Sequence, residues 1–374
     1  MAKIVLQFAY SRMKRGIAMS IVKALQAKLS DYELDGLLIS SNVNRRYVSG
    51  FTGTAGAVLL TETDALFLTD FRYTEQAMKQ VVDCSVMEQK GTLPQEVAAQ
   101  VERLRIKRLG FEKTQLTYAE FETYQNLLDN TKLIPVSQVV ESLRVIKTQE
   151  EIAIMQKAAA IADEAFAHIQ GYIKPGVREI DVSNELEFFM RKKGATSSSF
   201  DIIVASGVRS ALPHGVASEK TIEHGELVTL DYGAYYNGYC SDITRTLAVG
   251  DISDELLAIY ETVRVAQERA VEGIKAGITG KEGDALARDY IAEKGYGQYF
   301  GHSTGHGLGM EVHEGPSLST KSDMVLQPGM VVTVEPGVYI PGVGGTRIED
   351  DVVITENGNS TLTHSPRTLI HVGV

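Results

Sequence analysis

Residues 227–249 read Leu-Val-Thr-Leu-Asp-Tyr-Gly-Ala-Tyr-Tyr-Asn-Gly-Tyr-Cys-Ser-Asp-Ile-Thr-Arg-Thr-Leu-Ala-Val, two β-prone runs on either side of an Asn-Gly pair. An Asn-Gly pair in this position favours a two-residue type I′ turn, because both central residues of that turn need φ > 0. A turn at Asn237 and Gly238 places Asp231 directly opposite Thr244. The stretch therefore predicts a β-hairpin with a defined register.

The same register brings two carboxylates onto one face of the hairpin. Gly233 lies opposite Asp242, and side chains alternate between faces along a strand, so Asp231 and Asp242 share a face. The two acids are then diagonal neighbours, roughly 7–8 Å apart at Cα and closer at their tips. Since like charges at this distance repel each other, the pattern predicts cations between them, and a pair of metal ions is the simplest such arrangement.

The composition indicates a soluble globular protein. The chain of 374 residues is long enough for two domains, and 44% of its residues are hydrophobic. A membrane-spanning helix would need about 18 consecutive apolar residues, and the sequence contains no such run. A net charge of −11 without clustered Lys and Arg argues against nucleic acid as a partner. Cys84 and Cys240 have no spacing typical of a disulfide framework or a zinc ribbon, so we expect a cytoplasmic protein.

Two regions with different patterns predict two domains. Residues 19–143 alternate helical periodicity with short β-rich runs at 35–40, 57–60, 65–69 and 108–112, which predicts an α/β domain. Thr148-x-x-Glu151 has the form of a capping box before a long amphipathic run, so we place a second domain at 144–374. We expect residues 1–18 to form a weakly ordered extension. The helices predicted in the second domain lie at about 149–172, 178–193, 252–276 and 280–294.

Further acids and histidines in the second domain extend the candidate metal site. Glu335 and Glu349 each stand in an apolar strand pattern, and a hairpin centred on Gly342 would place them directly opposite each other. Between the two hairpins, residues 301–316 hold three of the chain's eight histidines. Several glycines there disfavour a helix, so the histidines four residues apart do not form the zinc pair of a helical motif.

The donor types point to hydrolytic metal chemistry. Four carboxylates and one imidazole suit Mn²⁺, Co²⁺ or Fe²⁺ better than copper or thiolate-bound zinc. With two ions roughly 3.5–4 Å apart, a bridging water loses a proton near neutral pH and becomes a hydroxide nucleophile, while the ions polarise a carbonyl group. The implied reaction is hydrolysis of an amide or ester. Any one of these acids, taken alone, is more readily explained as a surface residue, a turn former or a helix cap than as a metal ligand. The prediction of a metal site therefore depends on the acids and the histidine occurring together.

The motifs also resemble a known family, and the resemblance extends from about residue 20 through nearly all of the chain. The family is that of the metal-dependent Xaa-Pro peptidases, aminopeptidase P and prolidase. It implies an α/β (α+β) fold with a C-terminal pita-bread domain, two α/β halves around a dinuclear metal site, preceded by a creatinase-like N-terminal domain. The motifs are Asp231-x-Gly, Ser241-Asp242-x-Thr-Arg245, His302-x-x-Gly-His306-Gly-x-Gly, His313-Glu, Val334-Glu335-Pro-Gly and Arg347-Ile-Glu349-Asp.

The resemblance implies roles for individual residues. Two divalent ions would be bound, Mn²⁺ in the first place and Co²⁺ or Zn²⁺ as alternatives, with Asp242 and Glu349 bridging both. Glu335 would also act as the proton shuttle. The implied metal ligands are Asp231, Asp242, His306, Glu335 and Glu349, the implied catalytic residues are His214, His313 and Glu335, and the implied substrate-binding residues are His214, His302, His313 and Arg347.

The choice of activity depends on the N-terminal region. Residues 50–56 and 69–77 resemble short bacterial aminopeptidase P-like proteins, so we expect an enzyme that removes the first residue from peptides whose second residue is proline. Xaa-Pro dipeptidase (prolidase) is the alternative. A non-catalytic peptide-binding protein of the same fold is a remote alternative, because all five ligand positions hold residues that can bind a metal. Methionine aminopeptidase shares these five ligands but usually lacks an N-terminal domain of this kind. The expected partners are proline-containing peptides and a second copy of the chain, with neither nucleic acid nor membrane.

Overall fold

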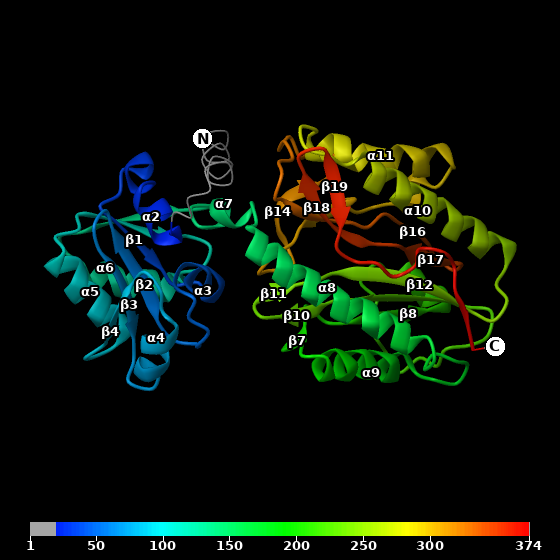
Figure 1. Ribbon diagram of the computed structural model, residues 1–374, viewed down its shortest axis with the longest axis horizontal. Helices are drawn as coiled ribbons and strands as arrows, with labels where there is room; N and C mark the ends of the chain where they lie inside the picture. Colours follow the sequence, from blue (N-terminus) through cyan, green and yellow to red (C-terminus); the bar gives the residue numbers. More distant parts are fainter. Residues whose placement is uncertain (1–19, 374) are drawn as a thin grey trace. The chain divides into compact units, whose positions relative to one another are not determined.

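The computed structural model describes residues 20–373. The extension predicted at residues 1–18 lies outside the described residues. The chain divides into two compact units, with the division between Leu143 and Arg144 (Figure 1). Both units combine helices with β-sheets, as the sequence patterns predict. Among the described residues, no helix has both the length and the apolar character needed to cross a bilayer.

A six-stranded mixed sheet forms the centre of the first unit. Its strands are β1 (Gly36–Ile39), β2 (Ala57–Thr61), β3 (Ala65–Thr69), β4 (Ser85–Glu88), β5 (Arg108–Glu112) and β6 (Lys132–Val136), in the order β4-β3-β2-β1-β5-β6. The helices of this region are α2 (Ile21–Gln26), η1 (Leu29–Tyr32), α3 (Asn42–Ser49), α4 (Thr74–Gln80), α5 (Leu93–Arg103), α6 (Tyr118–Leu127) and α7 (Glu141–Arg144). Val97 and Val101 of α5 and Tyr124 of α6 pack with the buried side chains of β1 to β3 in one hydrophobic core.

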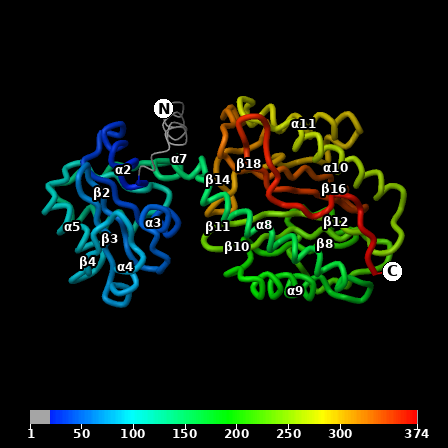
Figure 2. Tube along the Cα trace, viewed as in Figure 1, coloured from blue at the N-terminus to red at the C-terminus, as the bar shows by residue number. Residues whose placement is uncertain are grey.

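The second unit has two halves, each with a pair of long helices. In Figure 1 the pairs lie on opposite sides of the unit with the strands between them, and Figure 2 shows the same path of the chain, from green in the first half to red in the second. The first half contains α8 (Gln149–Ile169), α9 (Glu179–Lys192), β7 (Ser197–Ser198), β8 (Ile203–Ser206), η2 (Gly207–Ala211), β9 (Leu227–Tyr232), β10 (Ala234–Tyr236), β11 (Tyr239–Cys240) and β12 (Ile243–Val249). The second contains α10 (Asp254–Gly273), α11 (Gly280–Glu293), η3 (Gly297–Tyr299), β13 (Gly305–Gly307), β14 (Glu314–Leu318), β15 (Val331–Val334), β16 (Gly337–Ile340), β17 (Gly344–Arg347), β18 (Asp350–Thr355) and β19 (Gly358–Thr361), and the chain then returns to the first half as β20 (His371–Val372).

Four sheets cross this unit. Their strand orders are β20-β12-β9-β8, β11-β10-β7, β14-β13-β15-β18-β19 and β16-β17. The core of the first half consists of apolar side chains of α8 and α9 packed on β8, β9 and β12.

The four helices predicted in the second unit are confirmed as α8 to α11, with ends within a few residues of those expected. The capping box predicted at the start of α8 is present, because the Thr148 side chain accepts a hydrogen bond from the backbone N–H of Glu151 while the Glu151 carboxylate accepts one from the N–H of Thr148. Such boxes satisfy N–H groups that have no partner in the first turn of a helix. The same arrangement begins α5, α6 and α11.

The register predicted for the first hairpin is confirmed. Tyr236 pairs with Tyr239, and Asp231 pairs with Thr244, as a two-residue turn requires. The turn residues Asn237 and Gly238 have φ of 47° and 92°, the positive values of a type I′ turn.

The second hairpin also follows the predicted register, but both of its strands are interrupted. Val334 pairs with Asp350 on one side of the interruption and Gly337 pairs with Arg347 on the other, which leaves Glu335 opposite Glu349. Neither acid belongs to a strand. The Glu335 N–H instead donates to the carbonyl oxygen of Thr304 at 2.7 Å, and the Glu349 N–H to that of Thr244 at 3.1 Å. Each interruption therefore places a glutamate where its strand leaves one sheet for another.

Candidate active site and metal centre

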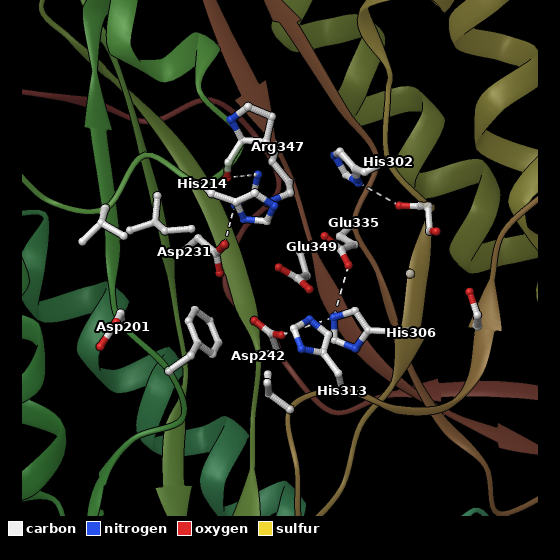
Figure 3. Close-up of a pocket in the computed structure, with 18 residues that line it drawn as sticks. Asp201, His214, Asp231, Asp242, His302, His306, His313, Glu335, Arg347 and Glu349 are labelled. Carbon is white, nitrogen blue, oxygen red and sulfur yellow. Dashed lines mark hydrogen bonds and ion pairs between the residues drawn. The ribbon is translucent and has the colours of Figure 1, made fainter. Parts of the chain in front are cut away.

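A cavity of about 520 Å³ in the second unit is lined by every residue that the sequence analysis assigned to the metal site, to catalysis or to substrate binding. Acids from both hairpins, His306 of β13 and histidines from the loops converge on it, as Figure 3 shows. The predicted residues that line it are His214, Asp231, Asp242, His302, His306, His313, Glu335, Arg347 and Glu349, and the others are Phe200, Asp201, Ile203, Pro213, Val216, Ser303, Gly305, Val312 and Ser317.

The two acids of the first hairpin are buried and only partly satisfied. Asp231 and Asp242 are 8% and 4% exposed. One carboxylate oxygen of each, Oδ1, is buried without a hydrogen-bond partner among the described residues. Burial raises the pKa of Asp242 well above its ordinary value, and the nearby carboxylates of Glu349 and Asp231 raise it further. A buried carboxylate with a free oxygen is costly unless a proton or a cation compensates it.

The imidazole of His306 points a lone pair at two carboxylates. Its Nδ1 lies 3.1 Å from the carbonyl oxygen of Gly307, which can only accept, so Nδ1 carries the proton. Burial lowers the pKa of His306 to about 4, so the ring is neutral and Nε2 has no hydrogen. That Nε2 lies 3.3 Å from Oε1 of Glu335 and 3.8 Å from Oδ2 of Asp242. Such an arrangement of acceptors favours a cation between them.

Three ligating groups form a tight cluster. One ligand atom each of Asp242, His306 and Glu349 lies within 4.8 Å of the others. Glu335 joins the cluster through His306, and burial raises its pKa to about 8. Asp231 lines the same cavity but lies outside this cluster of described residues, and its second oxygen accepts a hydrogen bond from Arg347. Burial favours the protonated forms of Asp242 and Glu349, and the neighbouring carboxylates in the cavity favour them further.

These observations fit divalent metal ions. The free oxygens of two buried acids, the unprotonated Nε2 of His306 and the mutual repulsion of the carboxylates would all be satisfied by cations with oxygen and imidazole ligands. No thiol lines the cavity within residues 20–373, so the donor set is that of a hard or borderline ion.

A chain of hydrogen bonds leads from Asp231 to His302. The Arg347 guanidinium donates to Asp231 and, at 2.6 Å, to the hydroxyl oxygen of Tyr339. Burial lowers the pKa of His302 to about 4, and its Nδ1 donates to the carbonyl of Ser303 at 2.8 Å. Its Nε2 is therefore an acceptor, and the Tyr339 hydroxyl, 2.9 Å away, donates to it. Both ring nitrogens of His302 are engaged inside the protein.

The sequence reasoning missed three residues that hold the ligands in place. Tyr339 offers no local signal beyond its place on a strand. Thr244 donates to Oε2 of Glu349 at 2.6 Å, and Thr333 donates to Oε1 of Glu335 at 3.3 Å. Both threonines stand two residues along the chain from an acid, so the alternation of side chains along a strand could have identified them.

His313 and His214 approach the cluster from two loops. The ring of His313 meets that of His306 edge to face with centroids 4.4 Å apart, and Figure 3 shows His214 beside Asp231. His313 is followed by Glu314, whose side chain is only 6% exposed and binds the side chains of Arg144 and Lys147. Burial alone would raise the pKa of Glu314, but these two cations hold it below its ordinary value. An ionised, doubly paired Glu314 therefore anchors the loop that carries His313.

Two family models match the chain. Residues 153–356 match the description "Metallopeptidase family M24" and residues 21–146 match "Creatinase/Prolidase N-terminal domain". A solved structure of an Xaa-Pro dipeptidase from Bacillus anthracis is 59% identical, covers 95% of this chain and 100% of its own, and superposes with a TM-score of 0.94.

Two further relatives bear on the activity. An Xaa-Pro dipeptidase of Pyrococcus horikoshii is 42% identical over 93% of this chain and 98% of its own. The crystal structure of an X-Pro aminopeptidase from Thermotoga maritima is also 42% identical, over 91% of this chain and 98% of its own, with a TM-score of 0.86. These matches confirm the predicted fold, a creatinase-type N-terminal domain followed by a pita-bread catalytic domain.

Proposed function

Because the chain belongs to metallopeptidase family M24, we propose that it is an Xaa-Pro dipeptidase, which hydrolyses the bond between the two residues of a dipeptide that ends in proline. Membership in the family makes it a metal-dependent hydrolase of peptide bonds. The dipeptidase assignment is supported by the names of the relatives from Bacillus anthracis and Pyrococcus horikoshii. Both names favour the alternative over the aminopeptidase P activity that the sequence led us to expect.

That expectation depended on residues 50–56 and 69–77. Both segments belong to the first unit, and no residue of either lines the described cavity. The relative from Thermotoga maritima keeps aminopeptidase P as the second candidate.

We infer that two divalent ions bind to the five predicted ligands. The proposal is supported most directly by the unprotonated Nε2 of His306, which faces the carboxylates of Asp242 and Glu335. Asp242 and Glu349 are proposed to bridge the ions, and the predominance of oxygen donors favours Mn²⁺. When bound, such ions supply Lewis-acid polarisation of the scissile carbonyl and a water of lowered pKa.

The protein's own groups have separate proposed roles. Glu335, whose Oε1 lies 3.3 Å from Nε2 of His306, is proposed to take up a proton and to pass it to the leaving nitrogen of proline. His214 and His313 are proposed to donate hydrogen bonds to the reacting carbonyl group. Arg347 is proposed to hold Asp231 in position and to orient the proline end of the substrate with His302. Because both ring nitrogens of His302 are engaged, it would contact proline through the face or edge of its ring.

The chemistry of proline explains why such a site is useful. Proline has no amide N–H and restricts the residue before it, so enzymes that hold their substrates by strand-like hydrogen bonds bind Xaa-Pro poorly. Recognition of the carbonyl and of the proline ring does not require that N–H.

Steady-state kinetics on Ala-Pro, Ala-Pro-Ala and Ala-Ala test the proposal. Enzyme stripped with EDTA should be inactive, and enzyme reloaded with Mn²⁺, Co²⁺ or Zn²⁺ should cleave Ala-Pro with a kcat/KM well above those for the other two. Efficient cleavage of Ala-Pro-Ala without Ala-Pro would identify an aminopeptidase P instead. Activity that survives metal removal would contradict the metallopeptidase mechanism. The homodimer and the cytoplasmic location stay predictions, and sedimentation velocity would test the first.

A further inference from the structure

The cavity has a fifth acid that differs from the four candidate ligands. Asp201 lines the cavity but is exposed, whereas Asp231, Asp242 and Glu349 are at most 8% exposed. Within residues 20–373 its carboxylate has neither a hydrogen bond nor an ion pair. In Figure 3 Asp201 lies on one side of the cluster of acids and His302 lies on the other. The cavity therefore has a free negative charge at the end away from His302.

An apolar wall lies beside this free carboxylate. Phe200 precedes Asp201 in the chain, Ile203 follows it by two residues, and Val216 pairs with Ile203 in an isolated β-bridge. All three line the cavity, and Val216 is 51% exposed. An apolar wall next to an exposed acid is suited to a long aliphatic side chain that ends in a cation, because such side chains bury their stems and keep the charged head in water.

From this geometry we propose that Asp201 selects dipeptides whose first residue is lysine or arginine. The inference rests on the proposed function. If the proline ring lies on the His302 side and the scissile carbonyl at the cluster, the side chain of the first residue extends toward Asp201. The α-ammonium group is a poorer partner for this acid, because it is attached to the carbon next to the scissile carbonyl and so stays near the cluster.

The experiment compares kcat/KM for Lys-Pro with that for Nle-Pro, since norleucine has the same straight stem without the charge. The wild-type enzyme should prefer Lys-Pro, and the Asp201→Asn variant should lose about two- to five-fold of that preference, the range typical of an exposed ion pair. Its kcat/KM for Nle-Pro should fall less than that for Lys-Pro, because norleucine has no charge for Asp201 to attract. Asp289→Asn is the matched control, because Asp289 is exposed on α11 and does not line the cavity, yet its substitution changes the net charge equally.

Two further measurements keep the inference falsifiable. The preference of the wild type should shrink at about 1 M ionic strength, where the Debye length is only about 3 Å, and Asp201→Lys should favour Glu-Pro over Lys-Pro. An unchanged ratio in Asp201→Asn, or an equal loss on Lys-Pro and Nle-Pro, would overturn the inference while the dipeptidase assignment stands. A wild type that cleaves no Xaa-Pro dipeptide would overturn both.

Discussion

Removing the metal should make the stability of this protein fall as the pH rises, and Glu335 allows the effect to be measured at one residue. Its carboxyl group is buried beside Asp231, and burial raises its pKa from 4.5 to about 8. Between these two values the metal-free folded protein keeps a proton on Glu335 that the unfolded chain has already released. Raising the pH then favours unfolding, because the unfolded state binds fewer protons.

The size of the effect follows from the same two pKa values. A difference between 4.5 and about 8 corresponds to about 5 kcal/mol at about 1.36 kcal/mol per pKa unit. The contribution is fully present below a pH of about 4.5 and is lost as the pH approaches 8, at up to about 1.4 kcal/mol per pH unit. Metal ions would replace the proton, so binding should release protons and should reverse the loss of stability.

The measurement is urea unfolding of EDTA-treated wild type and Glu335→Gln at several pH values from about 5 to 8. Glutamine is neutral throughout, so the free energy of unfolding of the variant relative to the wild type should increase with pH. Saturating Mn²⁺ should stabilise the wild type most at the highest pH. A difference between variant and wild type that does not change with pH would refute the argument that Glu335 holds a proton in place of a metal.

Three other substitutions test the site. Asp242→Ala should abolish Mn²⁺ binding in calorimetry and hydrolysis of Ala-Pro, and activity within tenfold of wild type would count against its role as a bridging ligand. In the metal-free protein, Arg347→Met should lower the free energy of unfolding by about 3–5 kcal/mol, because Asp231 would then stay buried without any cation; urea titration of EDTA-treated protein measures this, and a loss below about 1 kcal/mol would contradict it. Gly233→Ala places a Cβ 1.7 Å from the carbonyl oxygen of Ser241, so differential scanning calorimetry should find a loss of at least about 1–3 kcal/mol, and an unchanged Tm would speak against the tight packing of the hairpin.

The sequence predicted the hairpins well because their register is decided locally. Asn237 and Gly238 can adopt the positive φ values of a type I′ turn, and the pairing of every strand residue follows from that turn. The alternation of side chains then places Asp231 and Asp242 on one face. These steps need no knowledge of the rest of the molecule.

Two strands of the first unit escaped prediction for an equally local reason. β4 and β6 lie at the two edges of the six-stranded sheet, and their side chains are largely exposed or only partly buried. Edge strands lack the run of buried apolar residues that identifies β1 and β2. The edge position also explains why β6 tolerates Pro135, because some backbone N–H groups of an edge strand need no partner. Sequence patterns report burial, so strands with little burial are hard to recognise.

The contacts that hold the ligands could not be predicted, because they join segments far apart in the chain. Arg347 reaches Asp231 across 116 residues and Thr244 reaches Glu349 across 105. Only the packing of one half of the unit on the other brings these pairs together. The choice between aminopeptidase P and dipeptidase is hard to make for a related reason, since the motifs that led us to expect aminopeptidase P lie in the first unit and the cavity lies in the second.

The interruptions at Glu335 and Glu349 show how the fold reconciles strand structure with an acidic site. In a continuous hairpin the N–H of each glutamate would be directed to the facing strand or to solvent. Here the Glu335 N–H binds Thr304, just before the strand of His306, and the Glu349 N–H binds Thr244, two residues after Asp242. Each glutamate is thereby fixed to a segment that carries another candidate ligand. These backbone hydrogen bonds to both halves of the unit oppose the repulsion among the acids, so we expect Glu335 in the metal-free protein to keep a proton rather than to move away from its neighbours.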